Sequence, residues 1–181
     1  HIVIDGRSQD GTIEIINRHP HIAWISERDR GIYDALNKGI AMASGDFVAI
    51  CHSDDQFSST SSIFTLVSAL ERDGSDMVYA DCVYVDEDSG SKARWRRYYR
   101  SGELSRRRLS FGLAPAHTTL IIRAEVIRMM DSYSLDYPVC GDFEFFTRLL
   151  GKRYSYIRAP LVYMNTGGAS SFSLKNAGPL N

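Results

Sequence analysis

The chain has 181 residues, with 21 lysine and arginine residues against 22 aspartate and glutamate residues and a net charge of −1. This balance lacks the basic signature of a nucleic-acid-binding domain, and no apolar run is long enough for a membrane span. Cys51, Cys82 and Cys140 lack CxxC spacing, which argues against a disulfide framework or a zinc site and favours a reducing compartment.

Short apolar runs and polar turns alternate at the start of the chain. Residues 2–4 and 22–25 are predicted strands, and Thr12 begins a short helix between them. Strand, helix and strand at this spacing predict a βαβ unit of a parallel sheet. A second helix is predicted over residues 32–43, with Gly45 at positive φ after its end. Its expected apolar face consists of Ile32, Leu36, Ile40 and Ala43.

The stretch GDFVAICHSDD at 45–55 contains an apolar run, Phe47–Cys51, followed by the adjacent acids Asp54 and Asp55. Such a run predicts a buried strand of a parallel sheet, and ligands bind outside the carboxyl ends of these strands. Paired carboxylates at this place are suitable ligands for Mg²⁺ or Mn²⁺ that also holds a phosphate. A solvated turn is the alternative, and these residues alone favour neither.

The alternation continues through the second half of the chain. The serines of 58–62 precede a predicted helix that ends near Gly74, with an apolar stripe of Ile63, Leu66, Val67 and Leu70. Further strands are predicted at 77–85, 93–99, 117–123 and 156–164, a turn at 86–90, and helices at 124–130 and 141–150.

Seven arginines lie between residues 94 and 108, together with Trp95, Tyr98 and Tyr99. One interpretation is a solvated face on which the arginine stems lie along apolar surface. The alternative is that the arginines contact phosphates or an anionic membrane. The solvated face is favoured because the cluster spans two predicted elements.

Six stretches in one order carry a family resemblance: IVIDGRSQDGT (2–12), SERDRGIYDALNKGI (26–40), ASGDFVAICHSDD (43–55), HTTLIIR (117–123), GDFEFFTRL (141–149) and GGASS (167–171). The chain resembles the family 2 glycosyltransferases, and most of all the bacterial members that build polysaccharides and other glycans. The resemblance implies an α/β fold of the GT-A type, a Rossmann-like three-layer α/β/α sandwich with a mainly parallel central sheet.

The resemblance also implies a domain organisation. A glycosyltransferase domain is expected over residues 1–168, with a nucleotide-sugar half at 1–56, an acceptor half at 57–168 and a C-terminal tail at 169–181. Family members begin with an additional strand and helix that help to bind the base, and we expect this segment to be missing before His1. Arg7 stands where the common motif has a small residue.

Three acids take metal and donor roles by resemblance. Asp55 would ligate a divalent metal, Mn²⁺ or Mg²⁺, and Asp54 would support it or contact the ribose. Asp5 would hold the base or ribose, although an Asx-turn that caps its own loop is almost equally favoured. Asp10 is expected to cap the same loop.

Further binding residues follow from the matched stretches. Arg30 would reach a phosphate, and Asp34 and Asn37, three apart on one helical face, would bind the donor rather than form an ordinary polar helix surface. His117 would contact the acceptor or a phosphate by resemblance, although a lone histidine more often has a structural role. The backbone N–H groups of Gly167 and Gly168 would face the diphosphate or simply form a turn.

Asp142 is the expected general base. A helix N-terminus favours the ionised carboxylate, which is the form that accepts a proton. The alternative is a plain N-cap, and Glu144 is the neighbouring candidate base. Trp95, Tyr98 and Tyr99 are expected to pack the hairpin rather than stack on sugar rings.

The resemblance therefore implies an inverting, metal-dependent glycosyltransferase that uses a nucleotide sugar, foremost a UDP-sugar, and a glycan or lipid-linked acceptor in cell-surface polysaccharide biosynthesis. A cytoplasmic enzyme at the inner face of the membrane is expected, with peripheral membrane association and a homodimer left open and no nucleic-acid partner. The alternatives are a non-catalytic or truncated sugar-nucleotide-binding module and a sugar nucleotidyltransferase.

Overall fold

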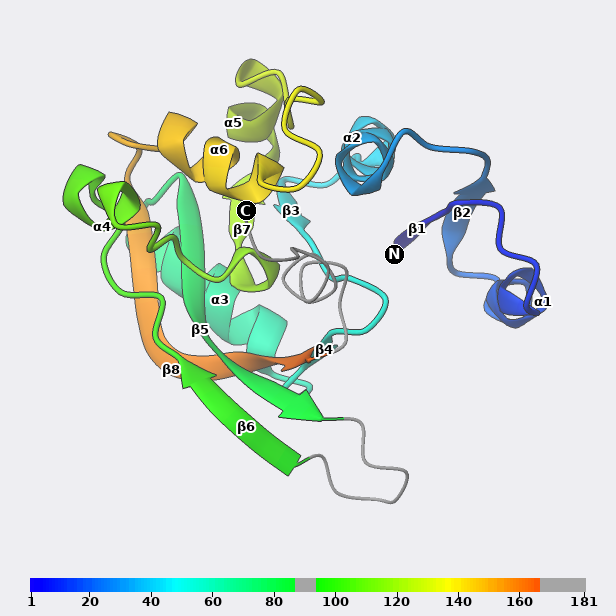
Figure 1. Ribbon diagram of the computed structural model, residues 1–181, viewed down its shortest axis with the longest axis horizontal. Coiled ribbons are helices and arrows are strands. Elements are labelled where there is room, and N and C mark those ends of the chain that lie inside the picture. The colour runs from blue at the N-terminus through cyan, green and yellow to red at the C-terminus, as the bar shows by residue number, and fades with distance from the viewer. Residues whose placement is uncertain (87–93, 167–181) are drawn as a thin grey trace, which may run out of the picture. The chain divides into compact units, whose positions relative to one another are not determined.

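The computed structural model describes residues 1–86 and 94–166. The chain forms two compact units (Figure 1). The first unit contains His1–Val48 and Arg123–Arg148, and the second contains Ala49–Ile122 and Leu149–Asn181. The turn predicted at 86–90 falls largely outside the described residues, and Gly167, Gly168 and the tail lie wholly outside them.

The first unit begins with a parallel pair of strands, β1 (Ile2–Asp5) and β2 (Ala23–Ser26), in a register that places Asp5 opposite Ser26. The helix α1 (Thr12–Ile16) lies between them in the sequence, so the predicted strand, helix and strand are confirmed. The next helix, α2 (Ile32–Met42), packs against β1.

The buried face of α2 differs from the predicted apolar stripe. Tyr33 and Asp34 are buried with Ile40, whereas Ile32 is 45% exposed. Tyr33 is buried by packing against another aromatic ring, and Asp34 is buried between two cations. Neither kind of contact can be predicted from the spacing of apolar residues. The prediction for Gly45 is also wrong, because the helix ends through an extended Ala43 and Gly45 has no positive φ. The chain then enters β3 (Phe47–Ala49).

Two helices from later in the sequence complete the first unit, α5 (Ala124–Met129) and α6 (Gly141–Arg148). The segment between them packs on α6 through Tyr133, whose ring centroid lies 4.5 Å from that of Phe145. Arg148 donates from Nη2 to the carbonyl of Ser132 at 2.7 Å, which fastens the same part of the segment, next to Tyr133.

The second unit is built around β5 (Met77–Asp86), which is buried from Met77 to Val83. The strand β8 (Tyr154–Asn165) runs parallel to β5 on one side. On the other side β7 (Ile121–Arg123) and β6 (Arg94–Tyr99) are antiparallel to it, and β4 (Gln56–Phe57) is antiparallel to β8. The α/β class is confirmed, and these described strands form a mixed sheet rather than a mainly parallel one.

The strand β8 curves strongly along its length, as Figure 1 shows in orange. Its register against β5 shifts on both sides of Asp81, which pairs with Pro160. Proline cannot donate to the ladder, so bulges at this position bend the strand.

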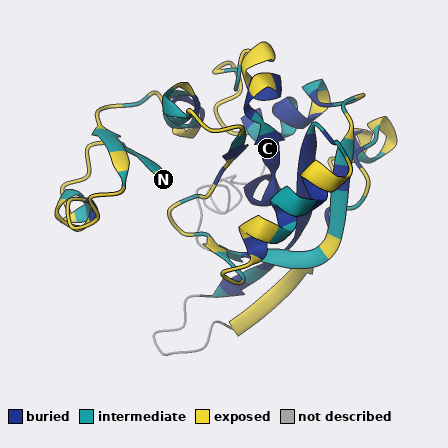
Figure 2. Ribbon diagram, turned by 180° about the vertical axis from the view of Figure 1, so that it is seen from behind, coloured by how far each residue is buried: buried dark blue, intermediate teal, exposed yellow. Residues whose placement is uncertain are grey.

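The helix α3 (Ser62–Arg72) packs against β5 and β8. Leu66 and Leu70 are fully buried, while Ile63 from the predicted stripe is 46% exposed and Ser62 is buried. Figure 2 shows the described part of the chain coloured by burial, with buried and exposed residues on the same helices. The hydroxyl of Ser62 accepts a hydrogen bond from the backbone of Ser59, which explains how a polar residue is accommodated there. Gly74 has a φ of +59°, which confirms the predicted helix end.

The strand predicted at 117–123 is shorter than expected. His117–Thr119 forms a 3₁₀ turn, η1, and β7 begins only at Ile121. The hydroxyl of Thr119 lies 2.7 Å from the carbonyl of Ala116, and this local bond competes with a strand ladder. A short helix, α4 (Arg106–Ser110), was not predicted. No described helix has the length and apolar character needed to cross a membrane.

Candidate functional site

The two adjacent acids lie in the turn between β3 and β4. The carboxylate of Asp55 is partly buried, and Oδ2 accepts a hydrogen bond from the hydroxyl of Thr118 at 2.6 Å. Burial raises the pKa of Asp55, and the charge of Asp54 adds to this, while the bond from Thr118 and the charge of His52 oppose it. Asp54 is exposed, and its carbonyl accepts from the side chain of Asn165 at 3.2 Å.

The turn that carries His117 is in contact with this acidic loop. The imidazole of His117 is buried and stacks on that of His52, with ring centroids 5.7 Å apart. Together with the bond between Thr118 and Asp55, this stacking joins two predicted site segments that are far apart in the sequence.

Within the described residues, no group of three or more His, Cys, Asp or Glu side chains is arranged to hold a metal. Mg²⁺ sites that also bind phosphate, however, commonly use only one or two protein carboxylates and complete their coordination with phosphate oxygens and water. The oxygen ligands of Asp55 and the neighbouring Asp54 fit that mode of binding.

The carboxylate of Asp5 is buried and fastens its own loop. It accepts hydrogen bonds from the backbone N–H groups of Arg7 and Ser8 at 3.0 and 3.1 Å, and from the hydroxyl of Ser26 at 2.5 Å. The Asx-turn given as the alternative is therefore present. The bonds from Ser26 and then Ser8 lower the pKa of Asp5. Asp10 accepts from the hydroxyl of Thr12 at 2.6 Å, in keeping with a capping role.

Asp34 lies between two cations. Arg30 contacts Oδ1 at 2.8 Å through Nη2, its backbone N–H donates to Oδ2 at 3.1 Å, and Nζ of Lys38 lies 3.5 Å from Oδ2. The bonds from Arg30 lower the pKa of Asp34. The side chain of Arg30 is 75% exposed, so its remaining donors face solvent.

Asn37 forms a two-point clamp on the backbone of Tyr133. Its Nδ2 donates to the carbonyl of Tyr133 at 2.8 Å, and its Oδ1 accepts from the N–H of Tyr133 at 2.9 Å. This contact occupies both ends of the amide and joins α2 to the segment before α6.

Asp142 lies inside the first turn of α6, one residue after its start. Its Oδ1 accepts from the N–H of Phe143 at 2.8 Å and from the hydroxyl of Tyr33 at 3.1 Å. The alternative candidate base, Glu144, forms an ion pair with Arg148 at 2.6 Å. Asp5 and Asp142 belong to the first unit, and Asp55 belongs to the second.

Two residues in these contacts were missed by sequence reasoning, Tyr33 and Thr118. Tyr33 lies in the quoted stretch GIYDALN, and Thr118 follows His117 in HTTL. Their partners are 109 and 63 residues away, so no local pattern could indicate the contacts.

The sequence matches glycosyl transferase family 2 over residues 1–132. Over 155 residues the chain is 32% identical to an uncharacterized glycosyltransferase of Mycobacterium tuberculosis, covering 82% of this chain and 56% of that protein. It is 25% identical over 181 residues to a PGL/p-HBAD biosynthesis glycosyltransferase of Mycobacterium bovis, covering 94% of this chain and 67% of that protein. The chain thus spans little more than half the length of the first of these relatives.

Solved structures share the fold. A structure of S. aureus TarS in complex with UDP aligns with a TM-score of 0.69 at 18% identity, covering 91% of this chain and 50% of TarS 1–349. The mannosyltransferase PcManGT of Pyrobaculum calidifontis, in complex with GDP-Man and Mn²⁺, aligns with a TM-score of 0.60 at 19% identity, covering 91% and 46%. The fold is therefore that of the GT-A glycosyltransferases. The match along the sequence and the curated relatives together establish that the chain belongs to glycosyl transferase family 2.

Proposed function

We propose that the protein is an inverting, metal-dependent glycosyltransferase that transfers a sugar from a nucleoside-diphosphate donor to a glycan or lipid-linked acceptor in cell-surface polysaccharide biosynthesis. The observation that carries the proposal is the Asp54–Asp55 pair after β3, with Asp55 fixed by Thr118. Structures of two proteins with the same fold contain UDP or GDP-Man, which supports a nucleotide-sugar donor.

On the donor side, Asp55 would hold Mn²⁺ or Mg²⁺, with Asp54 supporting it or contacting the ribose. A divalent cation there neutralises the charge that grows on the leaving diphosphate. The exposed guanidinium of Arg30 is suited to a phosphate. His117, next to the acidic loop, would contact the phosphate or acceptor side.

Other predicted binding residues would act mainly by shaping the site. Asp5 fixes the loop that follows β1, Asp34 fixes the backbone of Arg30 just before α2, and Asn37 fixes the segment before α6. The backbone N–H groups of Gly167 and Gly168 remain proposed contacts of the diphosphate.

In the transfer step, the acceptor hydroxyl oxygen attacks the anomeric carbon and its proton passes to the carboxylate of Asp142. The bond between that carbon and the diphosphate oxygen breaks, and its electron pair stays on the diphosphate. A single displacement inverts the anomeric configuration. Asp142 lies in the first turn of α6, and its carboxylate accepts the proton in this step.

The donor site is tested by binding. Isothermal titration of UDP, GDP and dTDP should show binding that requires Mn²⁺ or Mg²⁺, and Asp55→Asn should abolish the metal-dependent part. Glu71→Gln, which removes an exposed carboxylate of the same unit, is the matched control and should bind like the parent. If none of the three nucleotides binds at millimolar concentration with Mn²⁺, the proposed donor site is wrong.

The catalytic assignment is tested by turnover. Asp142→Asn should leave nucleotide binding unchanged and reduce transfer by at least about a hundredfold, within the usual range for loss of a general base. Asp136→Asn changes an exposed carboxylate of the same unit and should retain activity. A parent protein that binds nucleotide but never transfers sugar, to acceptors or to water, would instead support the non-catalytic module.

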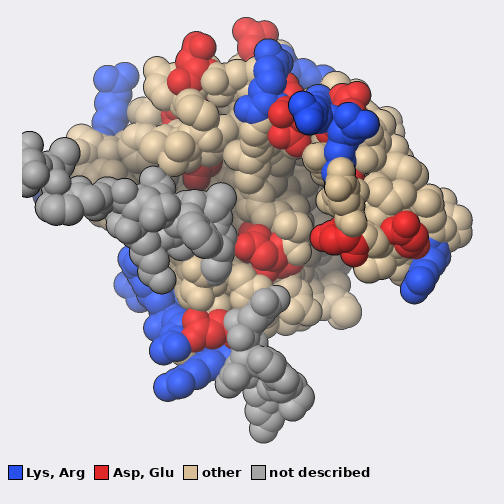
Figure 3. Space-filling view, turned by 45° about the vertical axis from the view of Figure 1, so that its right-hand side comes forward, with Lys and Arg blue, Asp and Glu red and all other residues tan. Residues whose placement is uncertain are grey.

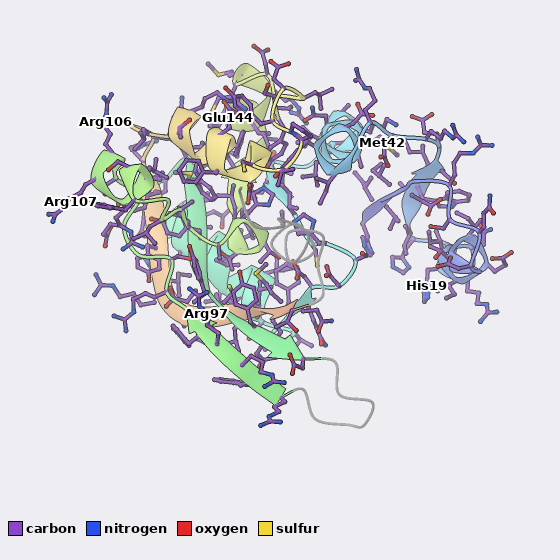
Figure 4. The ribbon with its side chains drawn as sticks, viewed as in Figure 1. His19, Met42, Arg97, Arg106, Arg107 and Glu144 are labelled. Carbon is purple, nitrogen blue, oxygen red and sulfur yellow. The ribbon has the colours of Figure 1, made fainter. Side chains whose placement is uncertain are left out.

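Peripheral membrane association is proposed from one surface of the second unit. Arg106 and Arg107 point outward from α4 (Figure 4), and Phe111 and Leu113 in the following turn are 73% and 43% exposed. Basic and apolar side chains together suit an anionic membrane surface. The protein should therefore cosediment with phosphatidylglycerol vesicles, but not with pure phosphatidylcholine.

Double substitution Phe111→Ser/Leu113→Ser should abolish this cosedimentation, and Phe64→Ser, in an equally exposed residue of α3, should not. Binding to both lipids, or none to phosphatidylglycerol, contradicts the proposal. We further propose a cytoplasmic location, with this surface facing the inner side of the membrane.

A further inference from the structure

We propose that Tyr33 and Gly141 position the carboxylate of Asp142 so that one oxygen is fixed and the other is left to accept the acceptor's proton. The proposal rests on the proposed function, in which Asp142 is the general base. Tyr33 comes from the stretch GIYDALN and Gly141 from GDFEFFTRL, so the inference links two stretches separated by about a hundred residues of sequence.

The two oxygens of Asp142 have different surroundings. Oδ1 accepts from the N–H of Phe143 at 2.8 Å and from the hydroxyl of Tyr33 at 3.1 Å. Among the described residues, none donates a hydrogen bond to Oδ2. Two donors from different helices on the same oxygen restrict rotation of the carboxyl group, and Oδ2 keeps its lone pairs for a substrate.

Gly141 makes room for the tyrosine ring. A Cβ atom at this position would lie 2.7 Å from Cε2 of Tyr33, a distance that real Cβ atoms do not adopt. The ring cannot easily move away, because Tyr33 is only 7% exposed and its ring stacks on that of Tyr133 at 5.6 Å. A glycine directly before the acid is therefore needed for the hydroxyl to reach Oδ1.

Tyr33 remains a hydrogen-bond donor over the whole working pH range. Burial raises the pKa of Tyr33 to about 12, and the nearby charge of Asp142 adds to the effect. The other titratable and charged groups around this pair are Tyr133, which is itself close to the charge of Asp142, and Arg148, which is paired with Glu144.

Tyr33→Phe tests the inference, because it removes the hydroxyl and keeps the ring. We expect the affinity for nucleotide and metal and the KM for the acceptor to be unchanged, and kcat to fall roughly tenfold. Tyr137→Phe, at an exposed tyrosine of the same unit, should match the parent.

Gly141→Ala should reproduce the kinetic defect by displacing the ring. If this variant does not fold, as judged by circular dichroism, Tyr33→Phe still decides the question. A parental kcat in Tyr33→Phe would overturn the positioning role, and so would a change confined to thermal stability or KM. If Asp142→Asn retains full transfer, Asp142 is not the general base, and both the proposed catalytic role and this inference are wrong.

Discussion

At the scale of single residues, Asp5 ties the loop after β1 to the neighbouring strand β2. The bond from Ser26 lowers the pKa of Asp5 below its ordinary value of 3.8, so it stabilises the folded state only while the carboxylate is ionised. Ser26→Ala should therefore lower the free energy of unfolding by about 1 kcal/mol at neutral pH. Parent and variant should converge as the pH falls below 3.8 toward the lowered value in the folded protein.

Urea unfolding of both proteins at pH 7 and at two acidic pH values measures this difference. Ser44→Ala, at an exposed serine of the same unit, is the control. A difference that stays constant with pH would show that the hydroxyl stabilises the fold by some route other than ionised Asp5.

Asp81 is a second residue whose importance lies in its surroundings. It is 1% exposed and accepts from the hydroxyls of Tyr98 and Tyr156, both at 2.6 Å, and from the N–H of Ser101 at 2.8 Å. Asp81→Ala would leave these donors without an acceptor and should destabilise the protein by about 3 kcal/mol.

Tyr98→Phe removes only one of these three donors, and the side chain of Tyr98 is half-exposed. This substitution should therefore lower the free energy of unfolding by only about 1 kcal/mol. Chemical denaturation of the two variants compares them directly. Equal effects would mean that the network around Asp81 adds nothing beyond a single bond.

At the scale of elements, most helices and strands were predictable because their signals are local. Glycines, the serine-rich run before α3 and apolar runs such as MVYADCVYV indicate where β5 and α3 lie. The buried faces were less predictable. Tyr33, Asp34 and Ser62 are buried through hydrogen bonds, ion pairs and ring stacking, whereas Ile32 and Ile63 remain outside. Periodicity measures hydrophobicity alone, so it assigns these faces incorrectly.

The clamp between α2 and the segment before α6 gives a prediction at this scale. Asn37→Ala leaves the N–H and carbonyl of Tyr133 without their partners and should destabilise the protein by about 2 kcal/mol. Asn37→Asp keeps the acceptor and should lose less. Thermal unfolding measures both, with Asn17→Ala at an exposed position as control. Unchanged stability in Asn37→Ala would mean that the clamp is replaced by water at no cost.

At the scale of the whole molecule, basic and acidic residues nearly balance, with 21 lysines and arginines against 22 aspartates and glutamates. On the face drawn in Figure 3, acidic and basic side chains lie interspersed, in keeping with the net charge of −1. Within each unit, by contrast, the contacts of the predicted site residues join segments far apart in sequence. The acids could be predicted from short sequence motifs. The contacts of Thr118 with Asp55 and of Tyr33 with Asp142 could not, because they depend on long-range packing.

Metal removal tests how the site and the fold are coupled. The described residues contain no closed metal cage, so dialysis against EDTA should leave Tm unchanged. Adding Mn²⁺ and UDP together at a hundred times their dissociation constant should raise stability by about 2.7 kcal/mol, and UDP with EDTA by much less. Differential scanning fluorimetry provides the measurement. Unfolding on EDTA treatment alone would show that the ion is structural.

The backbone passes from one compact unit to the other after Val48, Ile122 and Arg148, so neither unit is a continuous stretch of the gene. A recombination event that exchanged only the first 48 codons would separate Asn37 from Tyr133 and Tyr33 from Asp142. Evolution can therefore alter this half of the enzyme by point substitution more readily than by shuffling, because an exchanged block would have to carry two distant coding segments at once.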